Sequence, residues 1–188
     1  MERRNKDRRQ PRRIELPAWA QVGTARHQHI GRVVALLEEW AQKMKLPADE
    51  VSRWRMAGVL HDALRDAPEP MLRALSGEGR LPVNLLHGPA AAVRAEQDGE
   101  RRADVLDAVR FHTVGSPAWD PTGKALYLAD FLEPGRRFLK EERKALAARV
   151  PRDLDAAFRK CVQLRIEWTL NEGGEIIPET VALWNAVR

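Results

Sequence analysis

The sequence predicts a single all-α domain, and three observations carry that prediction. Apolar residues recur at helical spacing along most of the chain, no segment shows the alternation typical of a strand, and prolines separate the helical segments. With 188 residues, of which 44% are hydrophobic and 31% charged, the chain is long enough to bury one core. We expect a basic arm at residues 1–16 and one globular domain at residues 17–188.

The first long helix is the best marked, because its apolar residues follow the i, i+3, i+4, i+7 rule of a stripe that faces a core. These residues are Ile30, Val33, Val34, Leu37, Ala41 and Met44. The same periodicity, interrupted by proline and glycine, predicts eight further helices. Their ranges are 48–66, 69–76, 89–98, 101–111, 122–132, 138–149, 151–171 and 178–187.

The net charge of +5 is concentrated at the N-terminus. Residues 1–13 hold seven Lys and Arg against Glu2 and Asp7, so the rest of the chain is balanced. We interpret this segment as a disordered arm that folding does not need; a weak contact with RNA or an anionic surface is the alternative.

The chain shows no secretory signal pattern and nothing near the roughly 18 uninterrupted apolar residues of a membrane span. We therefore expect a cytoplasmic protein without a membrane partner. Cys161 is the single cysteine, so no intramolecular disulfide can form. It lies in a helical apolar pattern, as do Trp54, Trp168 and Trp184, and we expect all four in the core.

Four of the five histidines lie at predicted helix ends or on inward faces, whereas His27 is peripheral. They are His29, His61, His87 and His112. A lone inward histidine is usually a hydrogen-bonded core residue. Four of them, together with Asp62 and an inward Asp130, favour a divalent cation, which satisfies several buried ligands at once. The mixed nitrogen and oxygen set suits iron, manganese, zinc or nickel better than calcium or magnesium alone.

This ordered series resembles the HD-domain metal-dependent phosphohydrolases, which are named after a His-Asp doublet such as His61-Asp62. The flanking segments resemble, in order and spacing, the YqeK-type bacterial symmetrical diadenosine tetraphosphate hydrolases. They are "RHQHIGRV", "AGVLHDALR", "LLHGPAAA", "DAVRFHTVGSP" and "ALYLADFLEPGR". The resemblance extends from about residue 17 to the closing "IPETVALWN", so only the basic arm falls outside it.

The resemblance implies a helical bundle with its metal site between the central helices. The implied metal ligands are His29, His61, Asp62 and Asp130. Iron is the metal implied, with manganese or another divalent transition metal as alternatives. The implied substrate contacts are Arg65, His87, His112, Thr113, Asp130 and Arg136. In relatives with two ions, positions like His87 and His112 ligate the second ion and Asp62 bridges, so these two histidines have either role.

The sequence departs from the family pattern at two positions. Arg65 stands where lysine is frequent, which keeps a cation, and Ser116 stands where the form "HTxGRP" has arginine, which removes one. Without the resemblance, surface salt bridges would explain Arg65 and Arg136 equally well. With it, both are expected to bind phosphate through their fork-shaped donors.

The expected reaction is symmetrical cleavage of diadenosine tetraphosphate into two ADP by metal-bound hydroxide. A bound cation lowers the pKa of water from about 15.7 to about 7 and polarises the phosphoryl group. Asp62 would hold the metal and orient the hydroxide, while His87 or His112 stabilises or protonates the leaving phosphate.

Two other functions remain open at this point. One keeps the HD chemistry but acts on a nucleoside monophosphate or a cyclic nucleotide. The other is a nucleic-acid-binding protein in which the basic arm binds and the metal site is vestigial. The sequence also leaves open whether the protein is a monomer or a homodimer.

Overall fold

The computed structural model describes residues 14–79 and 81–188 and confirms the all-α prediction. No strand occurs in this part of the chain. The helices are α1 (Thr24–Met44), α2 (Ala48–Leu60), α3 (Glu69–Ser76), the 3₁₀ helix η1 (Val83–Leu85), α4 (His87–Gln97), α5 (Ala103–Phe111), α6 (Pro121–Leu132), α7 (Lys140–Arg149), α8 (Leu154–Asn171) and α9 (Pro178–Val187).

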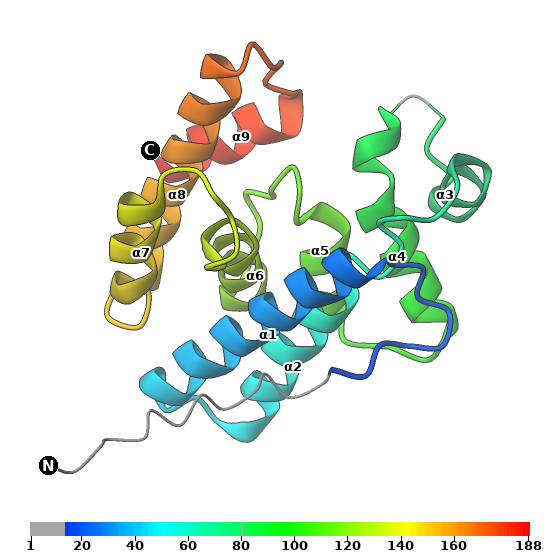
Figure 1. Ribbon diagram of the computed structural model, residues 1–188, viewed down its shortest axis with the longest axis horizontal. Coiled ribbons are helices and arrows are strands. Elements are labelled where there is room, and N and C mark those ends of the chain that lie inside the picture. The colour runs from blue at the N-terminus through cyan, green and yellow to red at the C-terminus, as the bar shows by residue number, and fades with distance from the viewer. Residues whose placement is uncertain (1–13, 80) are drawn as a thin grey trace, which may run out of the picture.

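Helix α6 occupies the centre of the bundle and contacts α1, α2, α5, α7 and α8. Figure 1 shows α7, α8 and α9 on one side of it and α3 and α4 on the other. Its sequence is apolar on nearly every face, which is typical of a helix surrounded by others. Asp120 caps its first turn by accepting hydrogen bonds from Thr122 N and Gly123 N, and Pro121 suits the first helical position.

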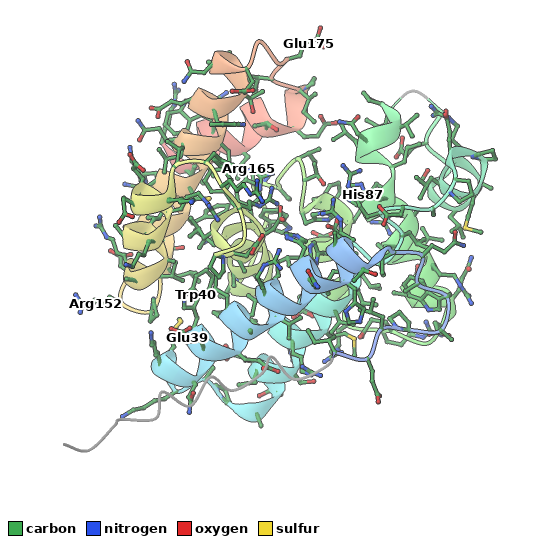
Figure 2. The ribbon with its side chains drawn as sticks, in the orientation of Figure 1. Glu39, Trp40, His87, Arg152, Arg165 and Glu175 are labelled. Atoms are coloured by element: carbon green, nitrogen blue, oxygen red, sulfur yellow. The ribbon has the colours of Figure 1, made fainter. Side chains whose placement is uncertain are left out.

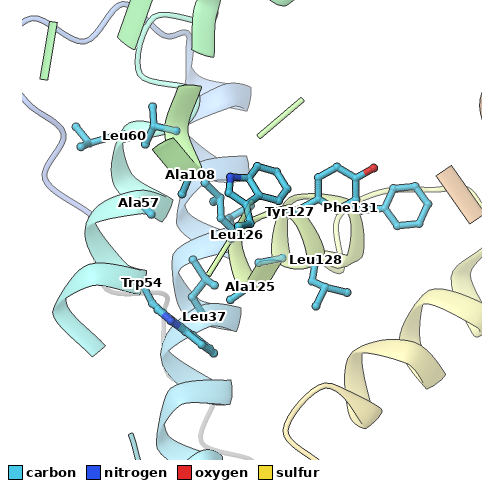
Figure 3. Packing of buried hydrophobic residues seen from close by; sticks show 14 of the residues in the cluster. Leu37, Trp54, Ala57, Leu60, Ala108, Ala125, Leu126, Tyr127, Leu128 and Phe131 are labelled. Atoms are coloured by element: carbon cyan, nitrogen blue, oxygen red, sulfur yellow. The ribbon is translucent and has the colours of Figure 1, made fainter. Parts of the chain in front are cut away.

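The core lies around α6 and includes the large side chains Leu37, Trp54 and Tyr127 (Figure 3). Helices α1 and α2 approach closely at Gly58, where a Cβ atom would lie 2.8 Å from Leu37 Cδ1. The predicted core positions of Trp54 and Cys161 are confirmed. The other two tryptophans are half-buried rather than central, and Trp168 stacks on Phe138 with ring centroids 4.4 Å apart.

The helix predicted over residues 48–66 is too long, because α2 ends at Leu60. Residues 61–66 form turns whose backbone bonds span three residues, such as Arg65 N to Asp62 O. The reason is a distant segment: Gln21 N donates to Ala63 O, and Gln21 O accepts from Asp66 N. These bonds replace the continuation of the helix and leave His61 and Asp62 at its end.

Other boundaries differ by a few residues. Helix α4 begins at His87 rather than at residue 89, because η1 and Leu86 lead directly into it. Helices α7 and α8 begin two and three residues later than predicted, and α8 begins after Asp153, which caps it by accepting from Ala156 N.

Residues 1–13 of the expected arm lie outside the described residues. Ile14, which was expected in the arm, is buried against Ile30, Val34 and Val59. The body therefore takes in residues before 17. Among residues 14–79 and 81–188, no helix combines the length and apolarity that crossing a membrane requires.

Candidate metal centre

Six side chains singled out in the sequence converge on one point between the central helices, and each is at most 7% exposed. They are His29 of α1, His61 and Asp62 after α2, His87 of α4, His112 after α5 and Asp130 of α6. Figure 2 shows His87 directed toward the middle of the bundle. The turn that ends α2 and the close approach at Gly58 bring the His-Asp pair beside His29.

The first group of ligand atoms comprises Nε2 of His29, Nε2 of His61, Oδ2 of Asp62 and Oδ1 of Asp130. Nε2 of His29 lies 3.2 Å from Asp130 Oδ1, 3.4 Å from His61 Nε2 and 3.6 Å from Asp62 Oδ2. His61 Nε2 also lies 3.6 Å from Asp62 Oδ2. Ligands about 2.0–2.2 Å from one cation are separated by distances of this size, so the group fits a transition metal.

The second group comprises Oδ1 of Asp62 and Nε2 of His87 and His112. His87 Nε2 lies 3.1 Å from Asp62 Oδ1 and 3.0 Å from His112 Nε2, and His112 Nε2 lies 3.5 Å from Asp62 Oδ1. Asp62 therefore presents one carboxylate oxygen to each group. Thr113 Oγ1, 3.1 Å from His112 Nε2, adds a hydroxyl beside the second group.

Three of the four histidines have a hydrogen-bond acceptor at Nδ1. His61 Nδ1 donates to Gly58 O at 2.7 Å, His112 Nδ1 donates to Val109 O at 2.8 Å, and His29 Nδ1 lies 3.2 Å from Glu133 Oε1. These partners hold the proton on Nδ1 and leave the lone pair of Nε2 directed at the centre.

His87 differs from the other three. Its Nδ1 lies 3.5 Å from Nη1 of Arg65, and a guanidinium can only donate. In the neutral imidazole the proton is then on Nε2, which can donate to Asp62 Oδ1. In the metal-free protein His87 is thus arranged to donate a hydrogen bond from Nε2 to Asp62.

Helix α4 carries His87 close to α5 because Gly88 has no side chain. A Cβ atom there would lie 2.9 Å from the carbonyl oxygens of both Val109 and Arg110 and 3.1 Å from His112 Nδ1. Any larger residue would separate the two histidines of the second group.

The carboxylates of Asp62 and Asp130 are ionised, and the imidazole of His61 is neutral. Burial lowers the pKa of His61 to about 4. Burial alone would raise the pKa of Asp62, but His61, His112 and His87 hold it well below its usual range. Arg136 has the same effect on the pKa of Asp130. Two anionic oxygens and neutral imidazole nitrogen are the ligand forms that a divalent cation needs.

Arginines surround the carboxylates. Arg26 Nη1 donates to Asp62 Oδ2 at 2.6 Å, and Arg136 Nη2 donates to Asp130 Oδ1 at 2.5 Å. Arg65 reaches His87 from a third direction. Arg65 and Arg136 were expected from the sequence, whereas Arg26 was missed, although it precedes His29 by one helical turn.

Glu133 supports the centre from behind His29, and the sequence analysis did not single it out. It accepts from Arg32 Nε at 2.5 Å and from Gly135 N at 2.6 Å. Although burial opposes its charge, His29 and Arg32 lower the pKa of Glu133 to about 2. Arg143 fixes the same turn by donating to the carbonyl oxygens of Phe131 and Glu133.

Arg165 of α8 is a further contact that the sequence did not reveal. Its Nη1 lies 3.5 Å from Asp130 Oδ2, its Nη2 donates to Thr113 O at 3.2 Å, and its guanidinium lies 4.2 Å from the ring centroid of Tyr127. Figure 2 shows it directed toward the centre from the C-terminal side. It joins the carboxylate of the first group to the loop beside the second.

Two positions named in the sequence analysis, His27 and Ser116, lie outside the centre. His27, expected to be peripheral, lies with Nε2 3.1 Å from Ile14 O. The hydroxyl of Ser116 accepts a hydrogen bond from Ala118 N within its own turn.

The chain is similar to two named bacterial enzymes. The chain is 29% identical, over 85% of its length and 87% of the relative's, to the symmetrical bis(5'-nucleosyl)-tetraphosphatase of Halalkalibacterium halodurans. It is 26% identical to the enzyme of that name in Bacillus subtilis, over 69% of this chain and 73% of the relative.

A crystal structure is similar over most of the fold. It is described as a predicted HD superfamily hydrolase involved in NAD metabolism, from Clostridium acetobutylicum, and matches with a TM-score of 0.76 and 27% identity over 88% of this chain and 90% of that one. The family model for the HD domain matches residues 26–156, a range that contains all six converging side chains. The chain therefore belongs to the HD-domain family.

Proposed function

We propose that this protein is a metal-dependent hydrolase that cleaves diadenosine tetraphosphate symmetrically into two ADP. The observation that carries the proposal is the carboxylate of Asp62, whose two oxygens face two adjoining groups of ligand atoms. The activity named for the relatives supports the choice of substrate. Iron is the proposed metal, with manganese or another divalent transition metal as alternatives.

The proposed metal ligands are His29, His61, Asp62 and Asp130. A divalent cation held there would supply a nucleophile from water at neutral pH and polarise a phosphoryl oxygen. The bond that breaks joins a phosphorus atom to the central bridging oxygen, and the bond that forms joins that phosphorus to the oxygen of water. Each half of the substrate then leaves as ADP.

His87 is proposed to stabilise the departing phosphate as a hydrogen-bond donor. Burial lowers the pKa of His87, so the ring is neutral, and the contact with Arg65 keeps its one proton on Nε2, which faces the centre. His112, with its lone pair facing the centre, would accept from a phosphate hydroxyl or ligate a second cation. This arrangement separates the roles of the two histidines.

The remaining side chains bind the polyphosphate. Arg65 and Arg136 lie on two sides of the centre with forked donors suited to phosphate oxygens, and Arg26 adds a third guanidinium. Thr113 offers a hydroxyl beside His112. Four negative charges in the substrate chain explain why so many cations surround a site that already binds a metal.

Product analysis tests the proposal. The full-length protein is loaded anaerobically with Fe²⁺ or Mn²⁺, incubated with diadenosine tetraphosphate, and the nucleotides are separated by anion exchange. ADP as the sole product is the expected result. Asp62→Asn should lose metal and turnover together, whereas Asp155→Asn, on the exposed face of α8, should lose neither.

Two outcomes would reject the assignment. One is release of AMP with ATP. The other is absence of turnover by metal-loaded protein when Asp62→Asn still lowers metal content. Parallel assays with AMP, cyclic AMP and NAD show whether the protein hydrolyses one of these nucleotides instead.

A further inference from the structure

A small pocket lies beside the second group of ligand atoms, and its walls are the sequence neighbours of two histidines of the centre. Leu85 and Pro89 flank His87, and Phe111, Thr113 and Val114 flank His112. The pocket therefore adjoins the candidate metal centre at Thr113, which lines the pocket and whose hydroxyl lies 3.1 Å from His112 Nε2. A base in the pocket would have Thr113 between it and the histidines of the second group.

The size and lining of the pocket select a flat apolar group. Its volume is about 150 Å³, whereas sites that enclose a whole drug-sized ligand start at about 300 Å³. Leu85, Phe111 and Val114 are each only half-buried. A ring inserted between them would cover apolar surface and meet the face or edge of Phe111.

Three charged side chains line the pocket: Arg110, Glu78 and Glu179 of α9. Arg110 can only donate, and the two carboxylates, when ionised, can only accept. Arg110 and Glu179 thus offer one donor and one acceptor from segments far apart in the sequence. Adenine presents the complementary pair on one edge, an N7 acceptor next to the N6 amino donors, whereas a 6-oxopurine has an acceptor at both places. The pair therefore favours a base with an exocyclic amino group.

The C-terminal helices hold this wall in place. Thr180, next to Glu179, donates to Val114 O at 2.8 Å. Gly115, at φ 89°, lies so close to Leu183 that a Cβ atom would be 2.3 Å from Leu183 Cδ2. Thr180 and Leu183 lie beyond residue 156, where the family match ends. Helix α9, which follows the matched domain, thus supplies one wall of the pocket beside the candidate metal centre.

We infer that this pocket is a nucleobase slot that takes the adenine ring of the nucleotide whose phosphates lie at Thr113 and His112. The inference rests on the proposed function for the identity of the nucleotide. It adds that one base is bound and selected by Glu179, Arg110 and the apolar walls, independently of the groups that hold the metal.

The test is calorimetric binding to Mn²⁺-loaded full-length protein, with ADP, IDP and pyrophosphate as probes. ADP should bind at least about tenfold more tightly than pyrophosphate, which lacks the base. Val114→Trp, which fills the slot, should remove that difference and leave the affinity for pyrophosphate and the metal content unchanged. Leu170→Trp, at an exposed position of α8, is the matched control and should bind all three probes as the wild type does.

A second variant keeps the inference falsifiable if Val114→Trp fails to fold. Glu179→Ala should abolish the preference for ADP over IDP, whereas Glu175→Ala, an exposed carboxylate outside the pocket, should keep it. Equal affinity of the wild type for ADP and pyrophosphate, or an unchanged preference in Glu179→Ala, would overturn the inference. Selective ADP binding without hydrolysis of diadenosine tetraphosphate would overturn the proposed function instead, and so the two failures are distinguishable.

Discussion

Arg26 Nη1 contacts the same oxygen of Asp62, Oδ2, that lies 3.6 Å from Nε2 of both His29 and His61. The guanidinium and a bound cation would thus share one carboxylate oxygen. A metal held by Asp62 would also neutralise this carboxylate, which would leave part of the charge of Arg26 for an incoming phosphate.

Replacement of Arg26 by alanine should separate substrate binding from metal binding. We expect the KM for diadenosine tetraphosphate to rise about tenfold, the size of one lost hydrogen bond to a charged group, while metal content stays the same. Arg26→Lys, which keeps the charge but loses the fork, should be intermediate. Steady-state kinetics with metal analysis of each variant make the comparison. Loss of metal in Arg26→Ala would show that the contact supports the ligand Asp62 instead.

Replacement of His87 and of His61 should also distinguish a residue that acts on the substrate from one that binds the metal. His87→Ala removes the proposed hydrogen-bond donor to the departing phosphate, so kcat should fall about 100-fold or more, the usual cost of losing one such donor, while the metal of the first group is retained. His61→Gln should lose the metal itself. The paired measurements are single-turnover rates and metal stoichiometry. Equal loss of metal in both variants would assign His87 to ligation.

The sequence was sufficient for the helices and for the six converging side chains, and insufficient for the residues that position them. Histidine and aspartate at helix ends are uncommon enough to be noticed in order along the chain. Arg26, Glu133 and Arg165 are charged residues in a chain where such residues are 31% of the total, and only the fold shows which of them are turned inward. The early end of α2 has a similar cause, because it depends on bonds to Gln21, 42 positions before Ala63.

Arg165 should matter for the order of the centre rather than for the chemical step. Arg165→Met keeps much of the side-chain volume but leaves Asp130 Oδ2 and Thr113 O without this partner. We expect the free energy of unfolding of the metal-free protein to fall by about 1–3 kcal/mol and metal affinity to weaken. Arg159→Met, on the exposed face of the same helix, is the control. Denaturant unfolding and chelator competition measure the two effects. An unchanged metal affinity would limit Arg165 to a packing role.

The affinity for metal should depend on pH through His29. Burial opposes protonation of this ring, but Asp130 and Glu133 outweigh it and raise the pKa of His29 above 6.5 in the metal-free protein. A cation needs the neutral ring, so it must displace that proton. Asp62 and Asp130 are already ionised, and the pKa of His61 is about 4, so none of these three groups binds a competing proton near neutrality. The affinity should therefore fall about tenfold per pH unit as the pH drops below the pKa of His29, and level off above it.

Competition between the protein and a chromophoric chelator for Mn²⁺, repeated across pH about 5.5 to 9, measures this dependence. Glu133→Gln removes one of the three carboxylates that favour the imidazolium, so its curve should bend at a lower pH than that of the wild type. Glu141→Gln, an exposed carboxylate of α7, should leave the bend where it is. The direction of the pH dependence follows from His29 alone. A proton on this ring competes with the metal, so it weakens metal binding only below the pKa of His29. A bend below pH 6.5 in the wild type, or a slope of two protons per cation, would contradict the assignment of a single competing proton to His29.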